Sequence, residues 1–156
     1  MTQTQAAIEP VSLTICRKFE ATPDELYAAF TDPALLARWM GPGSMRVVEA
    51  IAEAHVGGRY MVHMQDSAAD GSDEAHVVHG VFKELVPGVR VVQTWRWQSS
   101  DVETRLTLEF REVSARVTEL TLTHERFLDA EVRDKHEFGW SACLEKLAGI
   151  YPFVQV

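Results

Sequence analysis

Two histidines share faces with apolar residues, and they are the side chains best suited to chemistry in this sequence. His124 lies on the leucine side of an alternating stretch, and His136 lies one helical turn before Trp140 on an apolar helix stripe. An imidazole at either place could orient a ligand or act as a general acid or base. The plainer interpretation is a core histidine bonded to a backbone group, to Glu125 or to Glu137. No nucleophile lies at a recognisable spacing from either ring, so both are candidates only.

A metal site is the next chemistry that the histidines suggest. His76 and His79 are three residues apart in an expected strand, so their side chains point to opposite faces and cannot bind one ion together. A site would need His63 or His55 as well. The acidic segment 66–74 lacks the ligand spacing of an EF-hand, and we expect it to be a solvated hairpin loop. We therefore expect neither a metal nor a cofactor.

Tryptophan and methionine side chains are the most useful for binding. Trp95 and Trp97 share one strand face, and Tyr60 and Met64 lie on the apolar side of another strand. These side chains could wall a pocket or simply fill the core, and the indole N–H groups suit them to a wall. The full set that we expect around a pocket is Tyr60, Val62, Met64, Trp95, Trp97, Leu106, Leu108, Leu120, Leu122, His124, His136, Trp140, Cys143 and Leu144.

One long helix, expected from Asp129 to Tyr151, must position several of these residues. Asp129 is a suitable N-cap and Pro152 ends the helix. We expect Gly139 to let the helix approach its partner closely. The residues of its broad apolar stripe are Val132, His136, Gly139, Trp140, Cys143, Leu144, Leu147, Ile150 and Tyr151. Such a stripe needs a large apolar partner surface, and the candidate upstream is a sheet.

The segments before this helix predict that sheet. Alternating or β-branched stretches indicate strands at 11–19, 45–54, 60–65, 75–85, 89–98, 104–110 and 119–124. A capping box at Thr22 and Glu25 and the pair Asp32–Pro33 open two short helices after the first strand. Strands grouped together with helices at either end predict an α+β domain with an antiparallel sheet.

Composition limits the function classes. The chain has 156 residues, and we expect a flexible tail at 1–10 and one domain at 11–156. A formal net charge of −8 argues against binding nucleic acid or an anionic membrane surface. No long apolar run or signal peptide is present, so a cytoplasmic location is expected. We expect Cys16 and Cys143 to be buried, free thiols.

Several short motifs in fixed order resemble one protein family. They are Phe19–Pro23, Phe30–Pro33, Trp39–Pro42, Gly57–Tyr60, Gly80–Phe82, Thr94–Trp97, Leu120–His124 and His136–Trp140. They resemble single-domain proteins related to the C-terminal domain of the activator of Hsp90 ATPase. The resemblance implies the START-like helix-grip fold, similar to Bet v 1. In this fold a curved antiparallel sheet of six to seven strands wraps a long C-terminal helix, and a cavity commonly lies between them.

Three functions follow from these observations. The first is binding of a small, largely hydrophobic molecule between the sheet and the last helix. The second, an enzyme similar to polyketide cyclases and aromatases, would use His124 or His136. The third, a module that interacts with Hsp90, is disfavoured because the chain leaves no room for a separate N-terminal domain. The partner expected is thus a small hydrophobic molecule, and a homodimer stays open.

Overall fold

The computed structural model describes residues 11–67 and 73–154, so the tail expected at 1–10 and the tip of the acidic loop lie outside the described residues. The elements are β1 (Val11–Phe19), α1 (Pro23–Thr31), α2 (Pro33–Trp39), β2 (Arg46–Ala52), β3 (Arg59–Ser67), β4 (Asp73–Val86), β5 (Arg90–Trp97), β6 (Thr104–Ser114), β7 (Val117–Phe127) and α3 (Ala130–Leu147). This order of one strand, two short helices, six strands and a long helix is the order that the sequence predicts.

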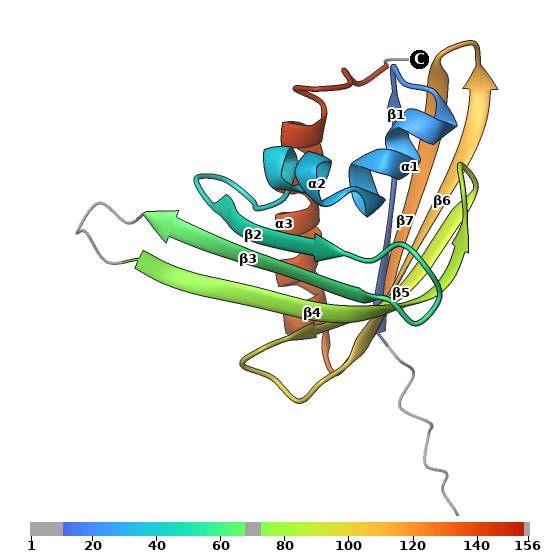
Figure 1. The fold of residues 1–156 in the computed structure, drawn as a ribbon. Helices are drawn as coiled ribbons and strands as arrows, with labels where there is room; N and C mark the ends of the chain where they lie inside the picture. Colours follow the sequence, from blue (N-terminus) through green and yellow to red (C-terminus); the bar gives the residue numbers. More distant parts are fainter. Residues whose placement is uncertain (1–10, 68–72, 155–156) are drawn as a thin grey trace, which may run out of the picture.

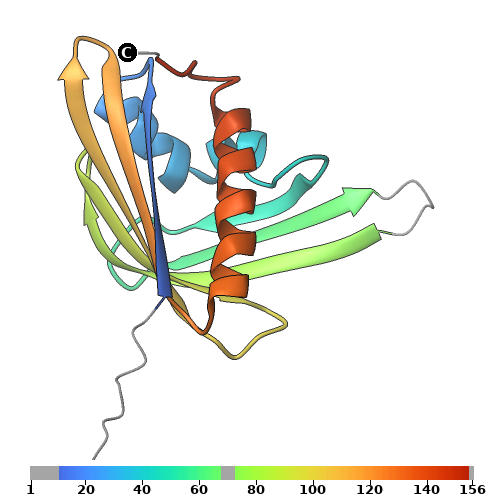
Figure 2. The ribbon, with the colours of Figure 1, turned by 180° about the vertical axis from the view of Figure 1, so that it is seen from behind.

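The strands form one antiparallel sheet in the order β1-β7-β6-β5-β4-β3-β2. The sheet is strongly curved: β1, β6 and β7 run roughly along α3, whereas β2, β3 and β4 cross its direction (Figure 1). Seen from behind, α3 lies along the concave side of the sheet (Figure 2). This arrangement is the helix-grip fold, and the expected fold class is confirmed.

Alternation along the strands builds the inner face of the sheet. In β7 the buried positions include Leu120, Leu122 and His124, while the residues between them are partly exposed. Leu122 pairs with Ile15 of β1 on one side and with Leu108 of β6 on the other. Each fully buried leucine contributes about 1.5–3 kcal/mol relative to an exposed one. The centre of the sheet is therefore a packed apolar floor beneath α3.

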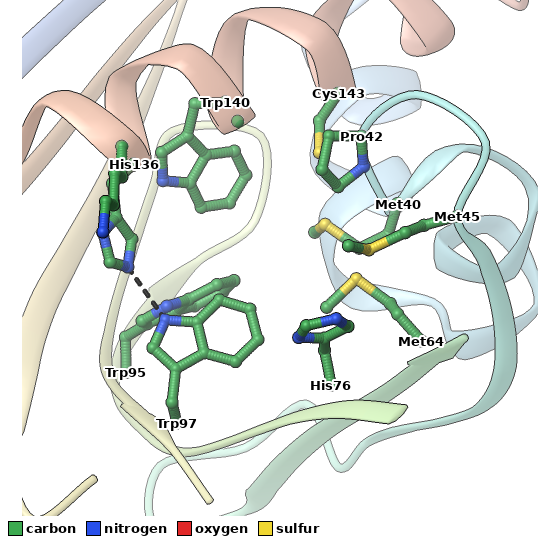
Figure 3. A pocket seen from close by; sticks show the side chains of 12 residues that line it. Met40, Pro42, Met45, Met64, His76, Trp95, Trp97, His136, Trp140 and Cys143 are labelled. Carbon is green, nitrogen blue, oxygen red and sulfur yellow. Dashed lines mark hydrogen bonds between the residues drawn. The ribbon is translucent and has the colours of Figure 1, made fainter. Parts of the chain in front are cut away.

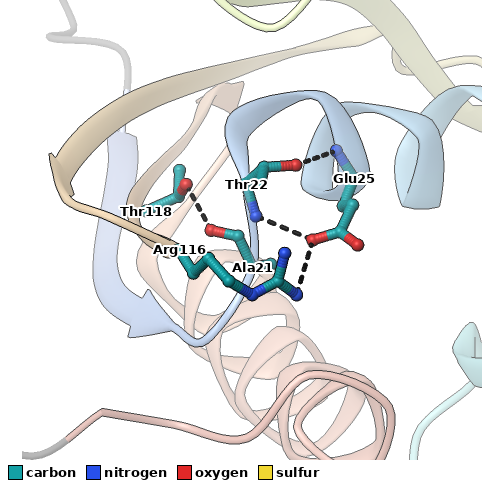
Figure 4. A network of polar contacts seen from close by, with 5 residues as sticks. All are labelled: Ala21, Thr22, Glu25, Arg116 and Thr118. Atoms are coloured by element: carbon teal, nitrogen blue, oxygen red, sulfur yellow. Dashed lines mark hydrogen bonds and ion pairs between the residues drawn. The ribbon is translucent and has the colours of Figure 1, made fainter.

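The predicted capping box starts α1. The Glu25 amide donates to Thr22 Oγ1 at 3.1 Å, and the Thr22 amide donates to Glu25 Oε1 at 2.8 Å. These two bonds satisfy two backbone donors that a helix start would otherwise leave unpaired. Arg116, in the turn before β7, and Thr118, at the start of β7, contact the same segment: Thr118 Oγ1 donates to the Ala21 carbonyl at 2.7 Å (Figure 4). The helix entry is thus attached to the start of β7.

The second short helix also begins as predicted. The Asp32 side chain accepts from the Ala34 amide at 2.9 Å, with Pro33 in the first turn. At its other end, Trp39 is fully buried and its indole N–H donates to the Ala29 carbonyl of α1 at 3.0 Å. This bond holds the two helices together just before the segment that joins α2 to β2.

The long helix α3 is shorter than the sequence predicts. Asp129 is its N-cap, as expected, and accepts from the Val132 amide at 2.9 Å. The helix ends at Leu147 instead of Tyr151, and the chain continues in hydrogen-bonded turns. Gly149 accounts for the difference, because glycine weakens a helix by about 1 kcal/mol relative to alanine. None of the described helices is both long and apolar enough to cross a membrane.

The buried face of α3 is also narrower than the expected stripe. Trp140, Cys143, Leu144 and Leu147 are buried, but Val132 is 37% exposed. The middle of α3, from Lys135 to Cys143, borders the cavity described below.

The two cysteines differ, which corrects one expectation. Cys143 is buried as predicted, whereas Cys16 is exposed; both thiols are free. Cys16 lies on the face of β1 opposite to Leu13 and Ile15, where its sulfur is 3.6 Å from Thr121 Oγ1. The period of two along the strand, and not the apolar character of cysteine, decides its exposure.

Candidate functional site

A cavity of about 450 Å³ lies between α3 and the inner face of the sheet. Its walls come from α3, β3, β4, β5 and the segment that joins α2 to β2 (Figure 3). The lining residues are Met40, Pro42, Met45, Met64, His76, Trp95, Trp97, Lys135, His136, Gly139, Trp140 and Cys143.

Three indoles form one wall of the cavity. Trp95 and Trp97 come from β5, and Trp140 comes from α3 (Figure 3). The Trp95 and Trp97 rings are perpendicular, at an interplanar angle of 88° with centroids 5.8 Å apart. The Trp95 and Trp140 centroids are 5.1 Å apart at 49°. These spacings are those of favourable aromatic pairs, so the wall is a packed corner of rings.

Sulfur atoms form the opposite wall. Met40, Met45, Met64 and Cys143 face the indoles across the cavity (Figure 3). Burial raises the pKa of the Cys143 thiol to about 11, so the thiol stays protonated at neutral pH and behaves as an apolar group. Burial likewise raises the pKa of the nearby Tyr60 phenol. This side of the cavity is therefore uncharged, and its thioethers are flexible enough to adapt to a ligand.

Behind the indole wall, a chain of hydrogen bonds holds His124. The Trp140 indole donates to His124 Nδ1 at 3.0 Å, and Thr104 Oγ1 donates to the Trp95 carbonyl at 2.8 Å. His124 Nε2 lies 2.7 Å from the same Thr104 oxygen. Because Nδ1 accepts and the Thr104 proton is already used, Nε2 must carry the imidazole proton and donate it. The network thus assigns a neutral His124 with both ring nitrogens bonded.

His136 is held in a matching way on α3. The Trp97 indole donates to His136 Nε2 at 2.9 Å (Figure 3). His136 Nδ1 is 2.9 Å from the Val132 carbonyl, which can only accept, so Nδ1 carries the proton. By contrast, the buried indole N–H of Trp95 has no hydrogen-bond partner among the described residues. Two of the three indoles of the wall are therefore fixed by a histidine.

Both histidines are poor candidates for acid–base catalysis in this state. Burial, with a smaller contribution from His136, lowers the pKa of His124 well below its usual value, and burial also lowers the pKa of His136. Each of the four ring nitrogens already has a partner. The two rings are 5.1 Å apart, so protonating one would disfavour protonating the other. They serve to fix tryptophans.

A lysine of α3 holds the loop that closes one side of the cavity. Lys146 Nζ donates to the Gly41 carbonyl at 2.7 Å and the Met45 carbonyl at 2.8 Å, and it lies 3.4 Å from the Gly43 carbonyl. These residues belong to the segment 41–45, here called the 41–45 loop, which supplies Pro42 and Met45 to the lining. Gly41 and Gly43 have positive φ values of 108° and 61°, which glycine adopts readily.

The residues expected around a pocket fall into two groups. Those that line the cavity are Met64, Trp95, Trp97, His136, Trp140 and Cys143. Those that lie in the packed core instead are Tyr60, Val62, Leu106, Leu108, Leu120, Leu122, His124 and Leu144. Their positions on a strand face or a helix stripe predict that all of these side chains point inward. A shared face does not predict which of them border a cavity.

Several lining residues were missed by the sequence reasoning. Met40, Pro42, Met45, His76 and Lys135 line the cavity without having been expected there. The sequence signal that could have identified the 41–45 loop as part of the lining is the pair of methionines, Met40 and Met45, beside a Gly-Pro-Gly turn. His76 lies on the inner face of β4, whereas His79 bonds to Gln98 at 3.0 Å. Within residues 11–67 and 73–154, no three His, Cys, Asp or Glu side chains cluster as metal ligands.

Gly139 has a different role from the expected one. A Cβ atom added there would meet no atom within 4 Å, so the glycine is not needed for close packing of α3 on the sheet. It lines the cavity, and its missing side chain leaves open space. The glycine therefore adds to the volume of the cavity.

Comparison with solved structures gives close matches in fold over nearly the whole chain. Protein CV1439 from Chromobacterium violaceum is 29% identical with a TM-score of 0.79, and the match covers 92% of this chain and 99% of that one. The AHSA1 protein SPO3351 from Silicibacter pomeroyi is 27% identical with a TM-score of 0.76, covering 89% and 96%. PFC0360w, described as an HSP90 activator from Plasmodium falciparum, is 25% identical with a TM-score of 0.72, covering 92% and 99%.

The comparison with curated proteins gives no match. The family model described as "Activator of Hsp90 ATPase homolog 1-like protein" matches residues 20–151. That range contains α1, every strand from β2 to β7 and α3, and it includes every residue that lines the cavity. The chain belongs to the activator of Hsp90 ATPase homolog 1-like family, whose START-like fold is that of a ligand-binding type of domain.

Proposed function

We propose that this protein binds a small, largely apolar molecule in the cavity between α3 and the sheet. The observation that carries the proposal is the cavity of about 450 Å³ walled by indoles on one side and by thioethers on the other. Pockets that take small organic ligands typically measure roughly 300–1,000 Å³ and are mostly apolar with few polar groups. A ligand that covers such walls gains about 25 cal/mol for each Å² of apolar surface removed from water.

The rigidity of the indole wall supports the same proposal. Trp97 and Trp140 are fixed by His136 and His124, so their rings keep their orientation without a ligand. Preorganised walls lower the entropy cost of binding. The thioether wall supplies the adaptability that the indoles lack.

A titration with N-phenyl-1-naphthylamine, an uncharged apolar fluorophore, tests the proposal. Its fluorescence should rise in a saturable way with one site per chain. Gly139→Leu should weaken that binding by about tenfold or more, because the added side chain would occupy open cavity space. Glu137→Leu is the matched control, since it adds the same side chain at an exposed position of the same helix. Binding that does not saturate, or that Gly139→Leu leaves intact, would contradict the proposal.

The other two candidate functions receive less support from the contacts. A cyclase-like enzyme would need a free nitrogen on His124 or His136, and every ring nitrogen has a partner. A role on Hsp90, as described for the Plasmodium relative, would be favoured if the chain stimulated the chaperone ATPase while failing to bind the fluorophore. One domain at 11–156, a cytoplasmic location and a homodimer stay predictions.

A further inference from the structure

The chemistry of the two walls and of the rim goes further than an apolar ligand in general. We propose that the cavity takes a planar aromatic molecule carrying an anionic group, with Lys135 pairing with that group at the rim. This proposal rests on the proposed function, since it names the class of ligand for the same cavity. Its two parts, the flat body and the negative charge, rest on different residues.

The flat body is argued from the walls. Trp95 and Trp97 meet at 88°, so an aromatic ring laid on one indole face would present its edge to the other indole. Stacked and edge-to-face pairs add about 0.5–1.5 kcal/mol per pair beyond the burial of apolar area, and an aliphatic chain gains neither. Across the cavity, Met40, Met45 and Met64 offer thioethers, and sulfur also contacts aromatic rings favourably. Both walls therefore favour rings over acyl chains.

The negative charge is argued from the rim. Among the described residues that line the cavity, Lys135 is the one lysine or arginine, and none is an Asp or Glu. The positive charge of Lys135 is opposite in sign to that of the protein as a whole, whose formal net charge is −8. The present partner of Lys135 is Glu131, whose carboxylate lies 3.6 Å away with both side chains mostly exposed. Such a pair contributes little, so an anionic ligand group could compete for the ammonium group.

The first arm of the test compares two fluorophores of the same ring skeleton. 8-Anilinonaphthalene-1-sulfonate carries a sulfonate, and N-phenyl-1-naphthylamine does not. Lys135→Gln should weaken binding of the sulfonate about two- to fivefold, as expected for a charge at an exposed rim, and leave the uncharged compound unchanged. Lys135→Glu should weaken the sulfonate further. Lys83→Gln and Lys83→Glu are the matched controls, because Lys83 is exposed on β4 and does not line the cavity.

The second arm tests the flat body. Naphthalene-1-sulfonate and decane-1-sulfonate have the same number of carbons and the same charged group, and each is used to displace the bound fluorophore. The naphthalene compound should displace it at the lower concentration. Equal or better displacement by the decane compound would overturn the aromatic part.

The charged part would be overturned if Lys135 and Lys83 variants changed sulfonate binding equally, or if neither did. Failure of this inference is distinguishable from failure of the proposed function. If the uncharged fluorophore binds and Gly139→Leu blocks it while the Lys135 variants have no selective effect, only the ligand class is wrong. If neither fluorophore binds, the cavity has no ligand-binding role and both proposals fall.

Discussion

The Thr104 hydroxyl connects the backbone of Trp95 to the His124 ring, which fixes Trp140. It donates to the Trp95 carbonyl and accepts from His124, which in turn accepts from Trp140. Thr104 is 6% exposed, so water cannot easily replace a lost bond. One hydroxyl therefore decides whether a buried imidazole proton has an acceptor.

We expect Thr104→Val to destabilise the protein by about 1–3 kcal/mol, although the two side chains have nearly the same shape. The cost arises because His124 Nε2–H is left buried without an acceptor. Urea denaturation measures the change in the free energy of unfolding. Thr107→Val is the control: Thr107 is similarly buried in β6 but faces the other side of the sheet, outside this chain of bonds. Equal effects of the two substitutions would contradict the role given to the Thr104 hydroxyl.

At the level of elements, α3 both covers the cavity and holds its border. Lys146, near the end of the helix, bonds to carbonyls of the 41–45 loop, and Ser44 of this loop donates to Asp66 of β3 at 2.7 Å. The loop therefore has one anchor on the helix and one on the sheet. Removing the helix anchor should loosen the border of the cavity while leaving the sheet intact.

Lys146→Met tests this arrangement. Hydrogen bonds from a charged donor are worth about 1.5–3 kcal/mol each, so the loop should open more often. The amide of Met45, bonded within the loop to the Pro42 carbonyl at 3.2 Å, should exchange with solvent about tenfold faster or more. Lys135→Met, on the same helix but without a bond to the loop, should leave the exchange rate unchanged. Unaltered protection of Met45 in Lys146→Met would show that the Ser44 anchor suffices.

The elements could be predicted because their determinants are local. Alternation or β-branched character identified the strands, and the Thr22–Glu25 box and Asp129 identified helix starts within a residue or two. The predicted end of α3 was wrong. The apolar stripe continues to Tyr151, but the helix ends at Leu147 and a turn follows at Gly149. The curvature of the sheet followed from the family resemblance and not from any periodic pattern.

The cavity could be predicted only in part, because a void depends on contacts between distant segments. Trp95, Trp97 and Trp140 are inward by periodicity, and they do reach the cavity. Met45 of the other wall lies in the 41–45 loop, which is held by a bond between residues 105 positions apart in sequence. The missing side chain at Gly139 looked like a means of close packing and instead leaves space. No local pattern distinguishes these two outcomes.

At the level of the whole molecule, the buried histidines couple folding to pH. Both have a folded-state pKa below the usual value near 6.5, mainly because burial disfavours the imidazolium form. Once the chain unfolds, both rings regain their usual affinity for protons. Below about pH 6.5 the unfolded state therefore binds more protons than the folded state, and the free energy of unfolding must decrease as the pH falls. The stabilisation that the neutral histidines provide is complete above about pH 6.5 and is lost on acidification.

We expect the urea midpoint to fall steadily between pH 7.5 and pH 5.5, a window above the range in which carboxylates titrate. Each histidine that stays neutral in the fold contributes up to about 1.4 kcal/mol per pH unit well below its unfolded pKa, and less for His136, which is only partly buried. His136→Gln should reduce the slope, because an amide can still accept from Trp97 but does not titrate. Phe138→Gln, which places the same amide at an exposed, non-titrating position of the same helix, should leave the slope unchanged. A urea midpoint independent of pH in the unmodified protein would contradict this prediction. It would mean that both imidazoles accept protons in the folded state without disturbing their tryptophan partners, and the neutral network described for His124 and His136 would be wrong.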